Sequence, residues 1–405
     1  MNRRHFLGAL ASSAAVTSVA QVANSAPTPS RSEKISLTRT PLVLMAPRED
    51  GCEAIWGVNQ LSKGRIEWEG EDGTKGVIGR DHFGFVPQSD DVLRIRLEGF
   101  KAGKNYRVRS VTSETNAIAP GTATVREQVS EWKTFQTLNS SAASTKFVVW
   151  NDTHVNNETI QKLDETTPAA DFLFWNGDTC NDWKTPEILV PTLLNPGQRD
   201  ITQGRPLFIS WGNHDSRGQH AFEMPRVVAT PNNRPFYGFR SGLVAAICLH
   251  TGEDKPDDHF SFGGRVAFDA LRREQSDWLA DVIREPAFRD APYRIVFCHI
   301  PLRWTKEEVP DHAKGGFDHV SLRSREAWHK SLVDWKTQLI ISGHTHRNAL
   351  IEANDQFPYA QVTGGGPAPK AATWMQAEAD GKEFNLAVHG LDGATRHEFK
   401  VRPLV

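Results

Sequence analysis

Residues 172–181 have the sequence FLFWNGDTCN, a short apolar run followed at once by polar residues and a glycine. A continuous apolar run of this length is typical of a strand that is buried on both faces of a sheet. The same texture recurs at 147–150, 207–211, 244–249, 295–298 and 339–341. Helix-like patterns lie between some of these runs, at 269–283 and 324–335. Residues 145–405 are therefore predicted to form an α/β domain, with further strands toward the C-terminus.

Side chains that can bind metals follow five of these runs. Ligands of open α/β sheets gather at the carboxyl ends of the strands, so we expect these loops to converge on one crevice. Aspartate, histidine and asparagine bind hard or borderline divalent metals. Each motif alone also occurs as an ordinary turn, but five in order at strand ends predict a metal centre. The residues concerned are Asp152, His154, Asp178, Asn213, His214, Asp215, His299, His344 and His346.

The motifs are D-x-H at 152–154, G-D-x-x-N at 177–181, G-N-H-D at 212–215, a single histidine at 299 and G-H-x-H at 343–346. As a set they resemble the calcineurin-like metallophosphoesterase superfamily over residues 145–366. The resemblance implies two packed β-sheets flanked by helices, with two divalent metal ions at the strand ends. Mn, Fe and Zn all suit the ligand types.

The resemblance also implies a role for each residue. Asp178 would be shared by both ions, and a hydroxide bridging the ions would attack phosphorus. The remaining ligands would be divided between the ions, with Asp152, His154 and His346 on the first and Asn213, His299 and His344 on the second.

Residues around these ligands are expected to assist the reaction. By the same resemblance, His214 would contact the phosphate and protonate the leaving oxygen, with Asp215 orienting its ring. Asn181 stands where purple acid phosphatases carry a tyrosine ligand, so we expect no purple colour and place Asn181 behind the ligands. Arg217 and Arg303 are candidate substrate contacts, with a solvated surface charge as the alternative for each.

Residues 35–139 show an all-β pattern. Leu93, Ile95 and Leu97 alternate with arginines, and turn signals separate short strands, which predicts a β-sandwich. This stretch loosely resembles a fibronectin type III-like domain, and its place before a phosphoesterase domain is similar to purple acid phosphatases. The predicted fold class is therefore two-domain, an N-terminal all-β sandwich followed by the α/β domain, with a short linker of small residues between them.

The first 26 residues predict an export signal. Arg3 and Arg4 precede an uncharged run of small and apolar residues, and the paired arginines resemble a twin-arginine signal. This implies a bacterial protein exported to the periplasm or the extracellular space. A membrane anchor is the alternative, but the run is weakly apolar for a spanning helix. Residues 27–34 are expected to be a flexible leader.

The composition limits the remaining possibilities. The 405 residues carry a formal net charge of −2, so no global charge favours nucleic acid or an anionic membrane as a partner. The four cysteines are too scattered for a disulfide framework and are expected to be free, namely Cys52, Cys180, Cys248 and Cys298.

The sequence thus predicts an exported, binuclear, metal-dependent phosphatase or phosphodiesterase that acts on a small phosphorylated substrate. A nuclease-type diesterase is one alternative, although no basic stripe with aromatic residues supports nucleic-acid binding. A non-catalytic binding or adhesion protein that uses the β-sandwich is another. The complete ligand set disfavours it. No stable membrane insertion is expected after removal of the signal, and the sequence does not indicate an oligomeric state.

Overall fold

The computed structural model describes residues 35–79, 84–115, 126–304 and 319–404. The predicted export signal and leader therefore lie outside the described residues. The residues from Ser36 onward form one compact unit.

A nine-stranded sheet contains the first three apolar runs of the α/β region as its central parallel strands. These are β10 (Thr145–Trp150), β11 (Phe172–Asn176) and β12 (Leu207–Ser210). Their side chains are buried almost throughout, as expected of strands that are covered on both faces. Beyond β10 the sheet continues with antiparallel strands, which are β19 (Thr373–Ala379), β20 (Phe384–Gly390) and β21 (Thr395–Val401).

A six-stranded sheet packs against the first one. Phenylalanine rings fill the space between the sheets, and Phe174 of β11 stacks on Phe297 with ring centroids 3.8 Å apart. Four neighbouring strands, β14, β15, β16 and β18, run parallel. The strands are β13 (Tyr237–Ser241), β14 (Val244–Leu249), β15 (Tyr293–Cys298), β16 (Leu339–Ser342), β17 (Ala349–Ile351) and β18 (Ala360–Thr363).

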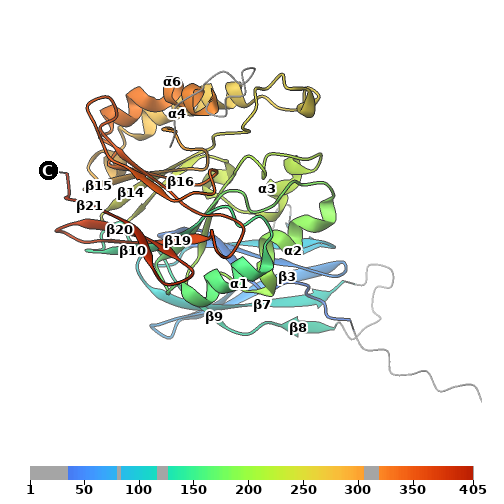
Figure 1. Ribbon diagram of the computed structural model, residues 1–405. Helices are drawn as coiled ribbons and strands as arrows, with labels where there is room; N and C mark the ends of the chain where they lie inside the picture. Colours follow the sequence, from blue (N-terminus) through green and yellow to red (C-terminus); the bar gives the residue numbers. More distant parts are fainter. Residues whose placement is uncertain (1–34, 80–83, 116–125, 305–318, 405) are drawn as a thin grey trace, which may run out of the picture. The chain divides into compact units, whose positions relative to one another are not determined.

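Helices cover the outer face of each sheet (Figure 1). On the nine-stranded sheet lie α1 (Asn157–Thr166), α2 (Leu189–Leu194) and α3 (Met224–Val227). The six-stranded sheet is covered by α4 (Phe268–Val282), α5 (Pro286–Arg289) and α6 (His319–Asp334). Mixed sheets with flanking helices are the arrangement predicted for this part of the chain. Single 3-10 turns lie at Pro186–Ile188, Pro196–Gln198, Ala221–Glu223, Pro231–Asn233 and Phe260–Phe262.

The N-terminal region is rich in β-strands, and three of them join the nine-stranded sheet. β1 (Val43–Arg48) pairs in parallel with β12, followed by β2 (Gly51–Gly57) and β6 (Val92–Leu97). The nine-stranded sheet therefore contains strands from both sides of the predicted linker. The other strands form a third sheet, made of β3 (Ser62–Gly70), β4 (Lys75–Ile78), β5 (Gln88–Ser89), β7 (Asn105–Glu114), β8 (Glu127–Val129) and β9 (Lys133–Gln136).

An apolar cluster with Trp56 and Val108 joins this third sheet to β1, β2 and β6. The fibronectin-like sandwich, as a separate domain, stays a prediction. A buried ammonium group also links the N-terminal strands to the rest of the unit. Nζ of Lys133, on β9, lies 2.6 Å from Oδ1 of Asp200 and 2.7 Å from Oγ1 of Thr202.

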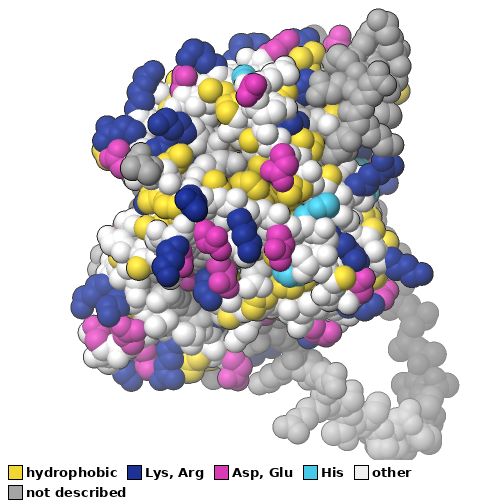
Figure 2. All heavy atoms as spheres, turned by 60° about the vertical axis from the view of Figure 1, so that its left-hand side comes forward, with side chains coloured by type: hydrophobic (Ala, Val, Ile, Leu, Met, Phe, Trp, Pro, Cys, Tyr) yellow, Lys and Arg dark blue, Asp and Glu magenta, His cyan; other side chains and the backbone are white. Residues whose placement is uncertain are grey.

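Acidic and basic side chains are interspersed over the face shown in Figure 2, in keeping with the small net charge. Within the described residues, no helix is both long and apolar enough to cross a membrane. All four cysteines are buried and free, as predicted.

Candidate metal centre

The loops that follow the parallel strands of both sheets are joined by backbone hydrogen bonds. The N–H of His154 donates to the carbonyl of Asp178 at 3.0 Å, and the N–H of Gly343 donates to the carbonyl of His299 at 2.9 Å. The N–H of His344 also donates to Oδ1 of Asp152 at 2.9 Å, so segments 192 residues apart in the sequence meet at one place. All seven predicted metal ligands lie there, and their roles as ligands stay a prediction.

The first group of potential ligands consists of Asp152, His154, Asp178 and His346. Nε2 of His154 lies 3.4 Å from Oδ2 of Asp178 and 3.0 Å from Nε2 of His346. Nε2 of His346 lies 3.5 Å from Oδ1 of Asp152. The side chain of His346 is 42% exposed and the other three are buried, so this group is open to solvent on one side.

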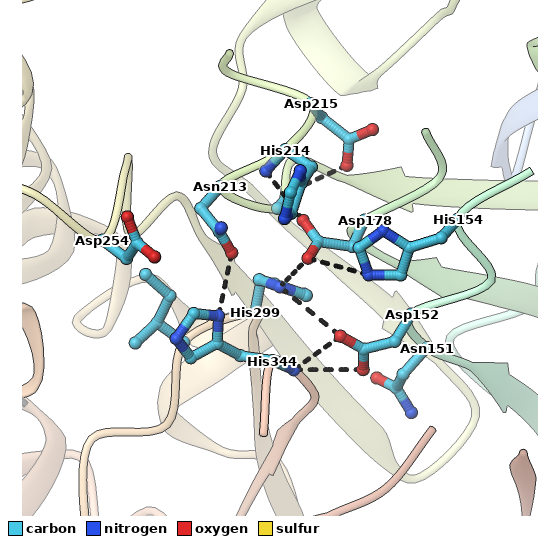
Figure 3. Close-up of polar contacts among 12 residues, drawn as sticks. Asn151, Asp152, His154, Asp178, Asn213, His214, Asp215, Asp254, His299 and His344 are labelled. Carbon is cyan, nitrogen blue, oxygen red and sulfur yellow. Dashed lines mark hydrogen bonds and ion pairs between the residues drawn. The ribbon is translucent and has the colours of Figure 1, made fainter. Parts of the chain in front are cut away.

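The second group consists of Asp178, His299 and His344, so Asp178 belongs to both groups (Figure 3). Nε2 of His299 lies 3.2 Å from Oδ2 of Asp178. Nδ1 of His344 lies 2.8 Å from Oδ1 of Asn213, which brings the seventh predicted ligand to the same place.

The backbone at these positions is unusual. Five of the seven predicted ligands have positive φ angles, namely Asp152 (52°), His154 (46°), Asp178 (50°), His344 (67°) and His346 (51°). Non-glycine residues in this region carry a conformational cost, and such residues cluster at functional sites. The fold thus maintains a costly loop geometry that turns these side chains toward one another.

Glycine is required where the backbone passes close to the carboxylates. A Cβ atom at Gly343 or at Gly365 would come within 3.0 Å of Oδ2 of Asp152. Gly343 belongs to the motif at 343–346. Gly365 belongs to none of the five motifs, and its closeness to Asp152 is a finding of the structure.

The protonation states of the potential ligands are compatible with cation binding. Burial lowers the pKa of His154 to about 4 and that of His344 to about 3, so both rings are neutral at pH 7 and can offer a lone pair. Burial opposes a charge on His299, but the carboxylates of Asp178 and Asp152 outweigh it and raise the pKa of His299 to about 10. Burial raises the pKa of Asp152 to about 8. Without a cation, the site thus retains protons to balance its carboxylates.

One buried atom tests directly whether the site suits a metal. Nε2 of His299 is buried and makes no hydrogen bond within the described residues, while Nδ1 of the same ring contacts the carbonyl oxygen of Asn176 at 2.9 Å. The carboxylate oxygen nearest to Nε2 is Oδ2 of Asp178 at 3.2 Å, so without a cation a proton lies between the two groups, and a divalent cation bound to both would replace it. Neutral imidazole nitrogens and carboxylate oxygens form a donor set that suits Mn, Fe or Zn. The residues therefore fit a divalent metal centre.

His214 lies at the edge of this centre, but its neighbours differ from those predicted. Its Nδ1 lies 3.2 Å from Oδ1 of Asp182 and contacts the carbonyl oxygen of Asn181. Asp215 instead accepts hydrogen bonds from the N–H groups of Thr179 and Gly212. The carboxylate beside the His214 ring is therefore that of Asp182. The carboxylate of Asp215 joins two loops by accepting hydrogen bonds from their backbone N–H groups.

Asn181 contacts two histidines of the site. Its Oδ1 lies 3.2 Å from Nδ1 of His154, and its carbonyl oxygen contacts His214. Its role behind the potential ligands stays a prediction.

The two candidate substrate arginines have different surroundings. Arg217 pairs with the buried carboxylate of Glu253, lies 3.1 Å from Asp254, and approaches both ring nitrogens of His214 at 3.4 Å. Arg303 is buried and donates to the carbonyl oxygens of Glu352 and Tyr359. Arg303 is thus engaged by the backbone, whereas Arg217 lies beside the centre.

Sequence reasoning missed Asp182 and Asp254. Figure 3 shows Asp254 on the side of Asn213 and His344. It follows β14, a predicted strand to which none of the five motifs belongs. The rule that found the other loops, that ligands gather at the carboxyl ends of strands, also applies there. Asp182 gives no such signal, because its partner, His214, lies 32 residues away in the sequence.

Comparison with protein families gives a match over residues 145–348 to the model described as "Calcineurin-like phosphoesterase". These residues contain all five motifs and make up half of the chain. No curated protein sequence matched the chain.

Two solved structures are similar in fold. The purple acid phosphatase PPD1 from yellow lupin (Lupinus luteus) seeds has a TM-score of 0.67 and 14% identity, covering 90% of this chain and 75% of its own. A structure of PhoD has a TM-score of 0.60 and 10% identity, covering 92% of this chain and 94% of its own. At these identities the likeness concerns the fold, and it extends over the N-terminal strands as well.

Proposed function

The chain belongs to the calcineurin-like phosphoesterase family, and from this premise we propose that it is a binuclear hydrolase of small phosphate esters. A metal-dependent phosphoesterase follows from the family, whereas the two-ion centre and the substrate size are our proposal. The observation that carries it is the position of Asp178, which belongs to both groups of potential ligands.

The assigned ligands would divide as the resemblance implies, with Asp178 shared. Divalent cations bound there would supply Lewis-acid chemistry, polarising the phosphoryl group and activating water. Asp152 and Asp178 contribute two negative charges, which leaves a pair of divalent ions with a net positive charge. Such a site attracts a phosphate anion.

His214 is the proposed proton donor to the leaving oxygen. The contacts of its Nδ1 with the carbonyl of Asn181 and the carboxylate of Asp182 favour a hydrogen on that nitrogen. Nε2 is then the atom that gives up a proton in the reaction. Asp182 would orient the ring, and Nη1 of Arg217 lies beside it, 3.4 Å from both ring nitrogens.

Three further features belong to the proposal. The metals are Mn, Fe or Zn, in a centre without a tyrosine ligand, because Asn181 stands at the relevant place. The paired arginines near the N-terminus support export to the periplasm or beyond. The substrate is a small phosphorylated molecule, because the near-neutral charge of the chain favours no nucleic-acid partner.

The test is to measure bound metal and hydrolysis in the same sample of the folded chain. Elemental analysis after reconstitution with Mn, Fe or Zn is expected to give two ions per chain. p-Nitrophenyl phosphate and bis-p-nitrophenyl phosphate then separate a monoesterase from a diesterase, and a strong preference for the diester would favour the nuclease-type alternative. A folded, reconstituted protein with one ion or none and no turnover on either compound would refute the proposal.

A further inference from the structure

A cavity of about 670 Å³, distinct from the metal centre, lies behind the loop that carries His214. Its volume falls in the range of sites that bind organic molecules of moderate size. The walls come from residues 211–235 and 250–271 and are largely apolar, with Trp211, Phe222, Val228, Phe262, Phe268 and Leu271 among them. None of the metal-binding candidates lines it.

Two strongly exposed aromatic residues lie in the segments that form the cavity. Phe222, which lines it, is 77% exposed, and Phe260, next to the lining residues Ser261 and Phe262, is 88% exposed. These are the two most exposed large apolar side chains of the described residues. Exposed apolar side chains gathered at a hollow are typical of a ligand-binding site.

A single short loop connects this cavity to the metal centre. Asp215 and Arg217 line the cavity, whereas His214 lines the opening of the metal centre. Nη1 of Arg217 lies 3.4 Å from the ring nitrogens of His214, and its guanidinium is fixed by Glu253 and Asp254. The loop that carries the proposed proton donor therefore borders both the metal centre and the apolar cavity.

The cavity walls also carry charged side chains. Arg217, which pairs with Glu253 and Asp254, lines the cavity together with Asp215, Arg234 and Arg265, and Nη1 of Arg234 lies 3.9 Å from Oε1 of Glu274. Arginine side chains cover apolar surface with their stems and place their charge at the rim. A cavity of this kind suits an apolar molecule that has a polar end.

We infer that the cavity binds the apolar alcohol portion of the substrate, so that the preferred substrates are phosphate esters of bulky aliphatic or aromatic alcohols. The inference rests on the proposed function. The group that His214 protonates is the leaving alcohol, and this alcohol must lie on the His214 side of the phosphate. The apolar cavity lies on that side.

The first test compares n-hexyl phosphate with ethyl phosphate on the metal-reconstituted full chain. The two leaving alcohols have nearly the same acidity, so a difference in kcat/KM reports binding of the longer chain. We expect hexyl phosphate to be favoured by about 10- to 200-fold, the range for added apolar groups in a fitting pocket.

Two variants locate the effect in the cavity. Phe222→Ser removes an exposed wall, and Ala267→Trp fills the rim at the start of α4. Both should lower the hexyl-to-ethyl ratio of kcat/KM by at least about threefold. Ala102→Trp, at an exposed turn of the N-terminal region, is the matched control and should keep the wild-type ratio.

A second measurement needs no turnover. The anionic aromatic probe 8-anilinonaphthalene-1-sulfonate should bind the metal-free full chain, and Phe222→Ser and Ala267→Trp should each weaken binding, whereas Ala102→Trp should not. Equal kcat/KM values for ethyl and hexyl phosphate, or probe binding that neither cavity variant changes, would overturn the inference. Absence of phosphatase activity in the wild type, with intact and cavity-dependent probe binding, would refute the proposed function and show that the cavity binds apolar anions but no substrate alcohol.

Discussion

Oδ2 of Asp178 lies 3.2 Å from Nε2 of His299, a buried nitrogen that makes no hydrogen bond within the part of the chain that the structure describes. The same oxygen also faces the first ligand group, with Nε2 of His154 at 3.4 Å. One carboxylate therefore serves two groups of potential ligands.

Asp178→Asn should remove metal and activity together, because it weakens the ligand that both proposed ions share. The expected loss of activity exceeds about 100-fold, the upper range for residues that only orient a ligand. Elemental analysis and hydrolysis assays on the folded variant check this. Asp171→Asn, at the opposite end of β11, is the matched control and should keep both. Full metal occupancy in Asp178→Asn would contradict the bridging role.

Metal affinity should rise with pH between 6 and 8. In the metal-free site the raised pKa of His299, about 10, and that of Asp152, about 8, mean that protons occupy ligand atoms in this range. Metal binding must displace these protons. For each proton released, the metal affinity should therefore rise about tenfold per pH unit. Calorimetric titrations at several pH values, in buffers with different ionisation enthalpies, measure both quantities. An affinity independent of pH would show that the ligands are already deprotonated.

Gly343→Ala should reduce metal affinity in a protein that still folds. The new Cβ would fall within 3.0 Å of Oδ2 of Asp152, so this carboxylate must move. We expect a loss of about 10- to 100-fold, as for disturbed ligand orientation. Gly381→Ala is the matched control, because nothing lies within 4 Å of the corresponding Cβ. Equal metal affinities of the two variants would argue against a constrained Asp152.

His214→Ala should retain its metal but slow turnover by about 10²- to 10⁴-fold on a substrate with a poor leaving group. The loss should be smaller with p-nitrophenyl phosphate, whose leaving group needs little protonation. His220→Ala, six residues further along, removes a histidine that pairs with Glu223 and should have little effect. Similar losses on both substrates would exclude the acid role for His214.

Lys133→Met should destabilise the whole unit by about 3 kcal/mol, the lower end of the range for a broken buried ion pair. The lower end applies because Asp200, the carboxylate left behind, is 25% exposed and can reach water. Lys101→Met is the control, since that lysine is 74% exposed and an exposed pair contributes at most about 1 kcal/mol. Urea unfolding measures both free energies. Unchanged stability in Lys133→Met would mean that this link does not stabilise the fold.

The apolar strands and the loops after them could be predicted from the sequence. The predicted run at 244–249 coincides with β14, and the helix expected at 269–283 is shifted by one residue from α4. Buried parallel strands are continuous apolar runs, and their carboxyl ends lie at one edge of a sheet, so the position of Asp178 and His299 follows from pattern alone.

Other features depend on contacts that no pattern contains. β1 is as apolar as the central strands, but nothing in its sequence shows that its partner is β12, more than 150 residues away. The neighbours of His214 are a similar case. Asp215 is adjacent in sequence, yet the turn sends its carboxylate toward Thr179, and Asp182 takes the place beside the ring.

The pairing of β1 with β12 has a consequence for any attempt to shorten the protein. A fragment that starts near residue 140 would lose β1, β2 and β6. The edge of β12 that pairs with β1 would then have no partner strand. Bare strand edges recruit other chains, so such a fragment should aggregate rather than act as a minimal enzyme. The same pairing delays assembly on the ribosome, because the earliest strands must wait for residue 207 to emerge before the sheet can close.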